Sequence, residues 1–587
     1  MTKINKVVID YNKIPLDDYP RPQLKRGSYI CLNGAWNYTI IKDKDKNKPF
    51  SFDKKIIVPY SVETPLSGVN HLMRPDEILI YNKRVIMPEG FKKDLLILHF
   101  DGVDQICDIY IDNKKVASHV GGYTRFEIEI SKYVILNSFV ITVVVIDPTD
   151  KGDLSRGKQC LNRGGIFYTS TSGIYKSVWL ESVKKEYIKE IRYTTFYKEK
   201  LLRMFIKTNF DGVCKVKINN QEIIMNSNQE TLIKLENFHP WSPNDPYLYD
   251  VNITFFDDVV KSYFGLREIK IARALDGFPR LYLNNKLIFI KGILDQGYYF
   301  LGNLTPESNA DYLSDIKNLK ELGFNTIRKH IKTESDIFYY YCDVQGMLVI
   351  QDFINGGNKY SKKASFWPGV FNAKYKKDDD KYKIYGRNNA EAQTQWINES
   401  KTIQRELYSH PSVIMYTIFN EGWGQFDSKF NYERFKENDI SRLYDTTSGW
   451  CDFGYSDFNS IHNYFFKHKI YKDKYSKIRP YIISEYGGYS LFLKDHFYGL
   501  HKFGYKKFKN IEDLTANYAA LNATIIPLIR DGLAGTIYTQ VSDVEDEVNG
   551  LYTFDRKVLK IKKEVIQDIN KKIDVENYKI ASIDHLQ

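Results

Sequence analysis

The sequence predicts a multidomain chain in which two β-sandwiches precede a (β/α)8 barrel. Its 587 residues exceed what one hydrophobic core usually supports. The first 274 residues show short alternating segments between Gly, Pro, Asp and Asn turns, whereas strand-like runs alternate with helical runs afterwards. We therefore expect domains at residues 1–182, 183–274 and 275–587.

The N-terminal segment carries strand-like runs of alternating apolar and polar residues. They lie at residues 35–40, 95–100, 107–112, 140–146 and 177–180. Such alternation is typical of strands with one buried face. Together with the turn residues between the runs, it predicts an antiparallel β-sandwich of jelly-roll type for residues 1–182.

A second β-rich segment follows from residue 183. Its strand-like runs lie at residues 202–207, 213–218, 249–255 and 262–271. Their length and spacing predict an immunoglobulin-like β-sandwich for residues 183–274.

The remaining residues, 275–587, predict a barrel of alternating strands and helices. Strand candidates lie at residues 287–293, 326–330, 348–353, 413–419, 447–451, 460–464, 481–484 and 535–540. Helical runs lie at residues 308–322, 336–344, 391–408, 432–444 and 512–529. Eight such units favour a TIM barrel. The insertion at residues 355–389 follows the third strand and is interpreted either as a lid or as a tolerated surface loop.

Two glutamates end strands of this predicted barrel. Glu421 follows the fourth strand, and Glu485 follows the seventh in Ser484-Glu485-Tyr486-Gly487. The C-terminal ends of the strands carry the chemistry of such barrels. Cleavage of a glycosidic bond requires two carboxyl groups, one to donate a proton and one to attack the sugar. The alternative for each glutamate is an ordinary solvated rim residue.

Composition argues against several other classes of protein. The net charge is +11, but the lysines are scattered among acids and no recognition motif accompanies them, so we expect no nucleic-acid partner. Residues 1–13 lack the apolar core of a secretory signal, and no run is long enough to cross a bilayer, so we expect a cytoplasmic protein without a membrane partner. The six cysteines lie far apart, which predicts neither a disulfide framework nor a zinc site.

An ordered set of motifs resembles glycoside hydrolase family 2 of clan A, the group of β-galactosidases, β-glucuronidases and β-mannosidases. The motifs span nearly the whole chain and are Arg21-Pro22, Leu32-Asn33-Gly34-Ala35-Trp36, Val58-Pro59-Tyr60, Ser172-Gly173-Ile174-Tyr175, Val178-Trp179-Leu180, Tyr263-Phe264-Gly265-Leu266-Arg267, Asn420-Glu421 and Ser484-Glu485-Tyr486-Gly487. The resemblance implies a retaining, exo-acting β-glycosidase that works by double displacement and needs no cofactor or metal.

The same resemblance implies roles for five residues. Glu421 is the general acid/base and Glu485 the nucleophile. Burial and a neighbouring carboxylate are expected to raise the pKa of the acid, whereas the nucleophile must stay ionised. Arg328 orients the nucleophile, Tyr464 donates a hydrogen bond to it, and Asn420 holds the sugar 2-hydroxyl. The alternative for Arg328 is an ordinary barrel ion pair.

Four more residues are candidate substrate contacts with equally ordinary alternatives. His462 contacts the sugar or is a hydrogen-bonded part of the scaffold. Trp423 is a platform for the leaving group or packs under its loop. Asp295 binds sugar hydroxyls or caps the turn before Gly297. Gln540, after the eighth strand, completes the set.

Departures from the family pattern bear on the substrate. Glucuronidases of the family carry an Asn-x-Lys motif after the eighth strand, where this chain has Asp546-Glu547-Val548-Asn549. Acids there would repel a sugar carboxylate, so glucuronides are disfavoured. Many relatives place a tryptophan on strand eight, where this chain has Thr539.

A neutral β-galactoside is therefore the expected substrate, with mannosides, arabinosides and glucuronides as alternatives. A transglycosylase would share every catalytic residue. A non-catalytic carbohydrate-binding protein is the alternative from another class. The family often forms oligomers, so a homo-oligomer is possible.

Overall fold

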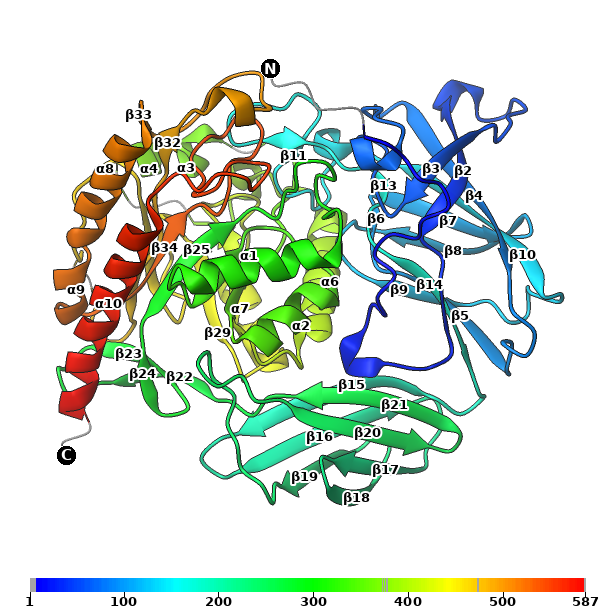
Figure 1. The fold of residues 1–587 in the computed structure, drawn as a ribbon, viewed down its shortest axis with the longest axis horizontal. Helices are drawn as coiled ribbons and strands as arrows, with labels where there is room; N and C mark the ends of the chain where they lie inside the picture. The colour runs from blue at the N-terminus through cyan, green and yellow to red at the C-terminus, as the bar shows by residue number, and fades with distance from the viewer. Residues whose placement is uncertain are drawn as a thin grey trace.

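The structure, a computed structural model, describes residues 7–584 apart from residues 360, 372, 374, 376, 377, 472 and 473. The start of the polar N-terminal segment, residues 1–6, and parts of the predicted insertion at residues 355–389 lie outside this description. The fold class expected from the sequence is confirmed, as two β-sandwiches stand beside a parallel barrel (Figure 1). The boundaries at residues 182/183 and 274/275 stay predictions.

The N-terminal sandwich consists of two antiparallel sheets. The first has the order β1 (Tyr29–Cys31), β14 (Val178–Val183), β5 (Leu95–Phe100) and β9 (Phe126–Glu129). The second has the order β3 (Lys54–Val58), β2 (Gly34–Lys42), β4 (Glu77–Ile86), β10 (Ser138–Ile146), β7 (Ile106–Ile111) and β8 (Lys114–Val120). In β10, Phe139, Ile141, Val143 and Val145 are buried and alternate with partly exposed residues, so the period of two read from the sequence marks the face that packs between the sheets.

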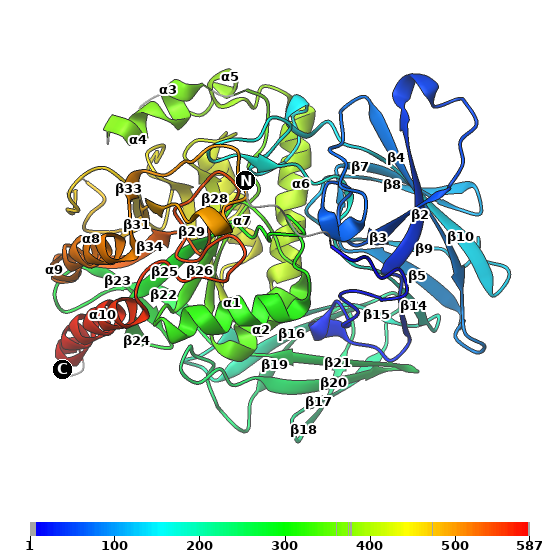
Figure 2. The ribbon, with the colours of Figure 1, turned by 45° about the horizontal axis from the view of Figure 1, so that its top comes forward.

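Four short strands of this domain lie outside the two sheets. They are β6 (Val103–Asp104), which pairs with β13 (Gly173–Ile174), and β11 (Gln159–Cys160), which pairs with β12 (Tyr168–Thr169). The part around β11 lies against the barrel in both views (Figures 1 and 2). We call residues 153–169 the sandwich loop.

The central sandwich also has two antiparallel sheets. One contains β15 (Ile188–Phe196), β16 (Leu201–Thr208) and β19 (Glu230–Lys234), and the other contains β18 (Gln221–Asn226), β17 (Val213–Ile218), β20 (Tyr249–Phe255) and β21 (Asp258–Phe264). The single strand predicted at residues 262–271 is wrong, because β21 ends at Phe264 and β22 (Ile269–Arg273) joins another sheet. β21 ends before Gly265, which packs closely on the barrel, since an added Cβ there would lie 2.8 Å from Pro411.

A small antiparallel sheet joins the central sandwich to the barrel. It contains β22, β23 (Pro279–Leu283) and β24 (Lys286–Ile288). The predicted first barrel strand, residues 287–293, merged β24 with the true first strand, β25 (Ile290–Asp295). Both are apolar, and only their pairing partners distinguish them.

The barrel is an eight-stranded parallel sheet. Its order is β29 (Leu443–Ser448), β28 (Val413–Asn420), β27 (Leu348–Asp352), β26 (Thr326–Lys329), β25, β34 (Leu533–Thr539), β31 (Tyr481–Gly487) and β30 (Asn459–Asn463). The fifth strand begins earlier than the predicted residues 447–451 and ends before Gly449, whose φ of +103° lies outside the β region. The predicted helix at residues 432–444 is wrong after Asn438, because the helix ends there and β29 already begins at Leu443.

Helices surround the barrel and cover its outer face. They are α1 (Asn309–Glu321), α2 (Asp336–Gln345), α6 (Ala390–Leu407), α7 (Ser428–Asn438), α8 (Ile511–Ala523), α9 (Ile526–Arg530) and α10 (Lys563–Asp584). The insertion holds the short helices α3 (Lys362–Ser365), α4 (Trp367–Phe371) and α5 (Tyr382–Tyr385), which project beyond the barrel in Figure 2. The pair β32 (Tyr489–Leu491) and β33 (Lys506–Phe508) stands after β31.

Five short 3-10 helices complete the described part of the chain. They are η1 (Pro22–Leu24), η2 (Asp43–Asp45), η3 (Pro65–Ser67), η4 (Thr149–Lys151) and η5 (Lys494–His496). Within the described residues, every helix is too short or too polar to span a membrane.

Candidate active site

The two glutamates meet at the C-terminal mouth of the barrel. Glu421 follows β28, which is buried along its whole length, and its N–H donates to the carbonyl oxygen of Ser448 at the end of the neighbouring strand (2.9 Å). Glu485 lies in β31. One oxygen of each carboxylate lies within 4.8 Å of the other. Direct attack by a carboxylate needs a separation of about 5–5.5 Å, whereas inversion needs about 6.5–9.5 Å to admit water. The observed spacing matches the first geometry.

Glu485 is held as an anion. Arg328 Nη1 donates to its Oε1 (3.1 Å), and the hydroxyl of Tyr464 donates to its Oε2 (2.5 Å). Burial alone would raise the pKa of Glu485, but the charges of His462 and Arg328, with the hydrogen bond from Tyr464, lower it to about 2. This carboxylate is therefore ionised throughout the neutral range.

Arg328 is fixed by more than one partner. Its Nε and Nη2 donate to the two oxygens of Asp352 (3.0 Å each), and Nη2 also donates to Oδ1 of Asn420 (2.9 Å). Asp352 in turn shares a hydrogen bond with His330 (2.9 Å). The sequence analysis missed Asp352, although an acid at the end of the third strand was a signal for it.

Glu421 has the opposite electrostatics. Burial raises the pKa of Glu421, and Glu485 adds to the rise, whereas the hydrogen bond with His462 opposes it. His462 Nδ1 lies 2.7 Å from Glu421 Oε1, while Nε2 lies 2.7 Å from the Ser448 hydroxyl and 3.5 Å from Glu485 Oε1. His462 thus stands between the two acids. One carboxyl is tuned to hold a proton and the other to lose it.

These three side chains could also reach one metal ion. Single ligand atoms of Glu421, His462 and Glu485 all lie within 4.8 Å of one another. However, both oxygens of Glu485 already accept hydrogen bonds from Arg328 and Tyr464, and a fixed guanidinium beside a cation is unfavourable. The donor set fits proton transfer and attack at carbon better than metal binding.

Tyr464 is positioned by a second tyrosine. Its ring stacks on that of Tyr505 at a centroid distance of 3.9 Å, and its oxygen lies 3.1 Å from Oγ1 of Thr539. Thr539, where the resemblance led us to look for a tryptophan, thus contacts Tyr464 through its hydroxyl. Tyr505 comes from a connection after β32 and carried no signal in the sequence.

The structure does not bring Asp295 to the two glutamates. Its carboxylate pairs with Lys329 (2.5 Å) and accepts a hydrogen bond from the N–H of Gly297 (2.8 Å). Asp295 and Lys329 are partners across β25 and β26 and share a face, while Arg328 points the other way into the site. The turn-capping alternative fits this placement.

Gln540 lies in a buried chain of amides beside the site. Gln296 donates to Gln540, which donates to Asn549 (2.7 Å each), and Asn549 donates to Glu547 (2.9 Å). The hydroxyl of Tyr168, from the sandwich loop, donates to the other oxygen of Glu547. Glu547 therefore ends this chain of buried polar side chains, whereas Asp546 accepts from the N–H groups of Leu500 and His501.

Trp423 packs against the sandwich loop. Its ring is 5% exposed and stacks on Phe167 at a centroid distance of 5.3 Å. Thr169 of the loop donates to Glu545, and Arg163 pairs with the same residue (2.8 Å). The sequence analysis missed this contribution of the N-terminal sandwich, because no local pattern shows which loop reaches a distant domain.

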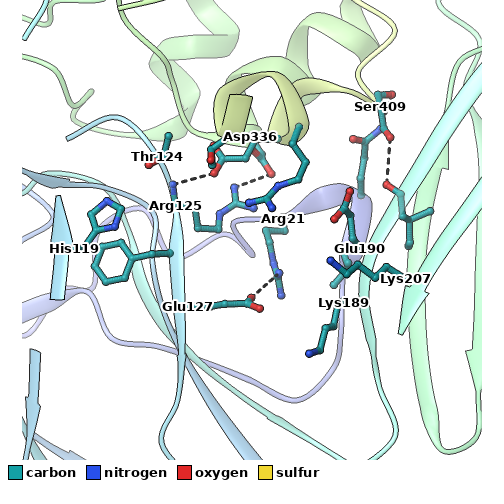
Figure 3. Close-up of a pocket in the computed structure, with 17 residues that line it drawn as sticks. Arg21, His119, Thr124, Arg125, Glu127, Lys189, Glu190, Lys207, Asp336 and Ser409 are labelled. Carbon is teal, nitrogen blue, oxygen red and sulfur yellow. Dashed lines mark hydrogen bonds and ion pairs between the residues drawn. The ribbon is translucent and has the colours of Figure 1, made fainter. Parts of the chain in front are cut away.

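A separate pocket of about 480 Å³ lies where the two sandwiches meet helices α2 and α6. Figure 3 shows charged side chains around it, with Arg125 paired to Asp336 (2.9 Å) and Arg21 near Glu127 (3.9 Å). None of the residues predicted for catalysis or substrate binding lines this pocket. The pairs Arg125–Asp336 and Arg21–Glu127 join elements around it, so we interpret the pocket as part of the packing between domains.

Comparison with known families matches three parts of the chain. Residues 28–183 match the sugar binding domain of glycosyl hydrolases family 2, residues 204–267 match a further domain of glycosyl hydrolases family 2, and residues 278–491 match the family's TIM barrel domain.

Individual proteins are similar over much of the chain. A β-galactosidase of Thermoanaerobacter pseudethanolicus is 24% identical over 355 residues, which cover 55% of this chain and 46% of that protein. A β-glucuronidase of Streptococcus agalactiae is 24% identical over 429 residues, 69% of this chain and 68% of that protein. The match thus spans about half the length of the first relative.

Among solved structures, a β-glucuronidase of an uncultured Clostridium species has the same fold. It superposes with a TM-score of 0.71 at 19% sequence identity and covers 94% of this chain and 99% of its own.

Proposed function

The chain belongs to glycosyl hydrolases family 2, and from this premise we propose that it is a retaining, exo-acting β-glycosidase. The observation that carries the proposal is the pair of carboxylates with oxygens within 4.8 Å and opposite pKa shifts. Glu421 protonates the departing oxygen while Glu485 attacks the anomeric carbon. Once Glu485 is esterified, its charge is lost, the pKa of Glu421 falls, and Glu421 then takes a proton from the incoming water.

The surrounding residues serve these two steps. Arg328 and Tyr464 hold both oxygens of Glu485, so the attacking carboxylate is oriented before the sugar arrives. Asn420 accepts from Arg328 through Oδ1, which turns its NH2 group away from the arginine and makes it a donor for the sugar 2-hydroxyl. We propose His462 as a residue that positions Glu421.

We propose β-galactosides as the first substrate to test. Asp546 and Glu547 stand where glucuronidases of the family carry a lysine, and Glu547 is buried beside Gln540 and Asn549. A sugar carboxylate at this wall would meet like charge. The similar β-galactosidase supports this choice. β-Glucuronides are the second candidate, because other relatives bear that name.

Two experiments test the proposal. The first is a panel of nitrophenyl β-galactoside, glucoside, mannoside, glucuronide and α-L-arabinoside, with NMR of the first-formed anomer. Turnover with a β-configured product from a β-glycoside supports retention, and first formation of the α-anomer would exclude it. A sugar acceptor added to the same assay separates hydrolysis from transglycosylation.

The second experiment assigns the two acids. Glu485→Ala should abolish turnover, and azide should restore it with an α-glycosyl azide as product, because azide then attacks the vacated face. Glu421→Ala should lose little rate on dinitrophenyl glycosides and at least about 100-fold on poor leaving groups, since only the latter need protonation. A non-catalytic binding protein would show no turnover with any of these substrates.

A further inference from the structure

The sandwich loop is anchored directly on the rim of the barrel. The N–H groups of Arg156 and Gly157 donate to the carbonyl oxygen of Asn355 (3.0 and 2.8 Å), and Ser155 forms a bridge with Gly356. Asn355 in turn donates through its side chain to the carbonyl oxygen of Asn420 (3.3 Å). Asn355 therefore links the sandwich loop by hydrogen bonds to Asn420, the residue before Glu421.

Gly157 brings the loop still closer to the neighbouring strand. Its φ is +59°, and an added Cβ would lie 2.8 Å from the carbonyl oxygen of Ile331. Any side chain at this position would push the loop away from the rim. Ile331 directly follows His330, so the residue after Gly157 is delivered between the ends of β26 and β27.

That residue is Lys158, whose side chain is mostly buried. It is 8% exposed. In the part of the chain that the structure describes, its ammonium group makes no ion pair and no side-chain hydrogen bond, and its ring contact is with Tyr168 (5.5 Å to the centroid). Taking an ammonium group out of water is costly unless a partner compensates for it.

Lys158 acts electrostatically on two residues of the site. Burial raises the pKa of Glu421, and the charge of Lys158 is among those that oppose the rise. The pKa of His330 is lowered to about 4, chiefly by burial and also by the charge of Lys158. Both effects agree with the anchoring of the loop between Asn355 and Ile331, which brings Lys158 to the rim of the barrel.

We propose that Lys158 binds an anionic group of the substrate, so that this protein prefers β-glycosides bearing a carboxylate or a comparable anion. The inference rests on the proposed glycosidase function and narrows its substrate class. If the anion belongs to the group from which the sugar is released, the preference agrees with the β-galactosides proposed above. If it belongs to the released sugar, as in a uronide, Lys158 favours the second candidate, the β-glucuronides, over the first.

This site differs from the place where the family's glucuronidases carry their lysine. That place holds Asp546 and Glu547 here, and Tyr168 of the sandwich loop donates its hydroxyl to Glu547. The same tyrosine ring lies beneath Lys158. The loop thus separates the acidic wall from the cation, and an anion is repelled from one side of the site and attracted to the other.

Steady-state kinetics with paired substrates test the proposal. The pairs are nitrophenyl β-galacturonide or β-glucuronide against β-galactoside, and a carboxyphenyl against an uncharged phenyl β-galactoside. In one of the two kinds of pair, Lys158→Gln should lower kcat/KM for the anionic substrate by about 10- to 100-fold. For the neutral substrate of the same pair, kcat/KM should fall by less than about threefold. Lys158→Arg should keep most of the preference. The pair that responds shows which part of the substrate carries the anion.

Lys176→Gln is the matched control. Lys176 is also 8% exposed, but its ammonium group donates to Thr333 and to the carbonyl oxygen of Glu334 (3.2 and 3.1 Å). Its loss should lower stability without changing the ratio of rates within a pair. An equal fall of both members in Lys158→Gln, or a wild-type protein that prefers both neutral members, would overturn the proposal.

Failure of the inference and failure of the proposed function give different results. If the wild-type protein cleaves only neutral galactosides, the glycosidase function stands and the role of Lys158 falls. If it cleaves no glycoside, calorimetry with two pairs, D-galacturonate against D-galactose and carboxyphenyl against phenyl β-galactoside, decides the role of Lys158 alone. Tighter binding of the anionic member of either pair that is lost in Lys158→Gln supports the role, and equal affinities within both pairs refute it.

Discussion

At the scale of single residues, Tyr464 and His462 differ in which of the two carboxylates they contact. Tyr464 donates to Glu485 alone, whereas His462 contacts Glu421 at 2.7 Å and lies 3.5 Å from Glu485. Each hydrogen bond stabilises the ionised form of the carboxylate that it reaches. Removing either partner should therefore shift the pH profile of kcat/KM in its own way.

Tyr464→Phe should move the acid limb of the profile to higher pH and leave the basic limb in place. Glu485 must be ionised to attack, and the hydrogen bond from Tyr464 helps to lower its pKa to about 2. Without that bond the pKa rises, so activity is lost at a higher pH on acidification. We also expect kcat to fall by about 10- to 100-fold. Tyr247→Phe, in the central sandwich, is the control, and an unchanged acid limb would contradict the assignment.

His462→Asn should move both limbs to higher pH. The histidine opposes the burial that raises the pKa of Glu421, so without it Glu421 keeps its proton to higher pH and the basic limb moves up. It also lowers the pKa of Glu485, so the acid limb moves up as well. The measurement is the pH profile of kcat/KM. A basic limb that moves to lower pH would show that His462 does not lower the pKa of Glu421.

At the scale of elements, hydrophobic period predicted the barrel strands well, and backbone conformation accounts for most of the errors. The predicted fifth strand ran past Gly449, and the predicted strand at residues 262–271 ran past Gly265. In both cases the predicted run continues beyond a glycine at which the strand ends. The apolar content of a run does not show where the backbone leaves the strand, so the ends of the strands were harder to predict from the sequence than the strands themselves.

The insertion after β27 contacts the strand end that carries Glu421. An added Cβ at Gly422 would lie 2.8 Å from the sulfur of Cys451 and 3.3 Å from the ring of Tyr385 in α5. Gly422 has a φ of +75°, and Glu421 before it has a φ of +53°. The backbone at the proton donor is therefore set by packing against the inserted helices.

Gly422→Ala should reduce activity more than stability. The new methyl group forces the turn away from Cys451 and displaces Glu421, so we expect kcat to fall at least about tenfold, because catalytic groups tolerate little misplacement. Gly90→Ala is the matched control, since Gly90 has a φ of +74° and nothing within 4 Å of an added Cβ. It should cost about 1 kcal/mol of stability at most and leave kcat unchanged. Equal kcat values for the two variants would refute this reading of the turn.

At the scale of the whole molecule, the proximity of the two glutamates was predictable and the residues around them were not. Glu421 and Glu485 stand at strand ends with recognisable neighbours, and the structure brings them together. Tyr168 and Phe167 reach the site from the N-terminal sandwich, and Tyr505 reaches it from a connection after β32. Nothing in the sequence around these residues indicates a contact with a separate domain, because such contacts depend on how the domains pack.

Burial of acids in the N-terminal sandwich gives the molecule a pH-dependent stability. Glu63 accepts a hydrogen bond from the N–H of Ser172 (3.0 Å) beside the buried Asp147, and burial raises the pKa of Glu63 to about 8. At the junction with the barrel, burial raises the pKa of Glu406 to about 7. An unfolded glutamate has a pKa of about 4.3. Between that value and its folded pKa, each residue binds more protons in the folded state than in the unfolded state.

The free energy of unfolding should therefore fall as pH rises from about 6.5 to about 8, because the folded state binds more protons than the unfolded state over this range. Buried histidines with lowered pKa values, such as His119 and His330, act in the opposite sense only below about pH 6.5. Depressed acids such as Glu485 lose their contribution only as pH falls below about 4. In the window from about 6.5 to 8 the raised acids, Glu63 and Glu406 among them, therefore dominate, and Lys83 and Lys332, whose pKa values are lowered to about 8, oppose them only near its upper end.

Glu63→Gln should flatten this dependence by about 1–2 kcal/mol across the window, since an amide keeps a donor and cannot ionise. The measurement is the free energy of unfolding from urea titrations at both ends of the window, followed by tryptophan fluorescence. Glu89→Gln replaces an exposed glutamate of the same sandwich and should leave the slope unchanged. Identical slopes for Glu63→Gln and the wild-type protein would mean that Glu63 is ionised in the folded state and that its burial is compensated by solvent.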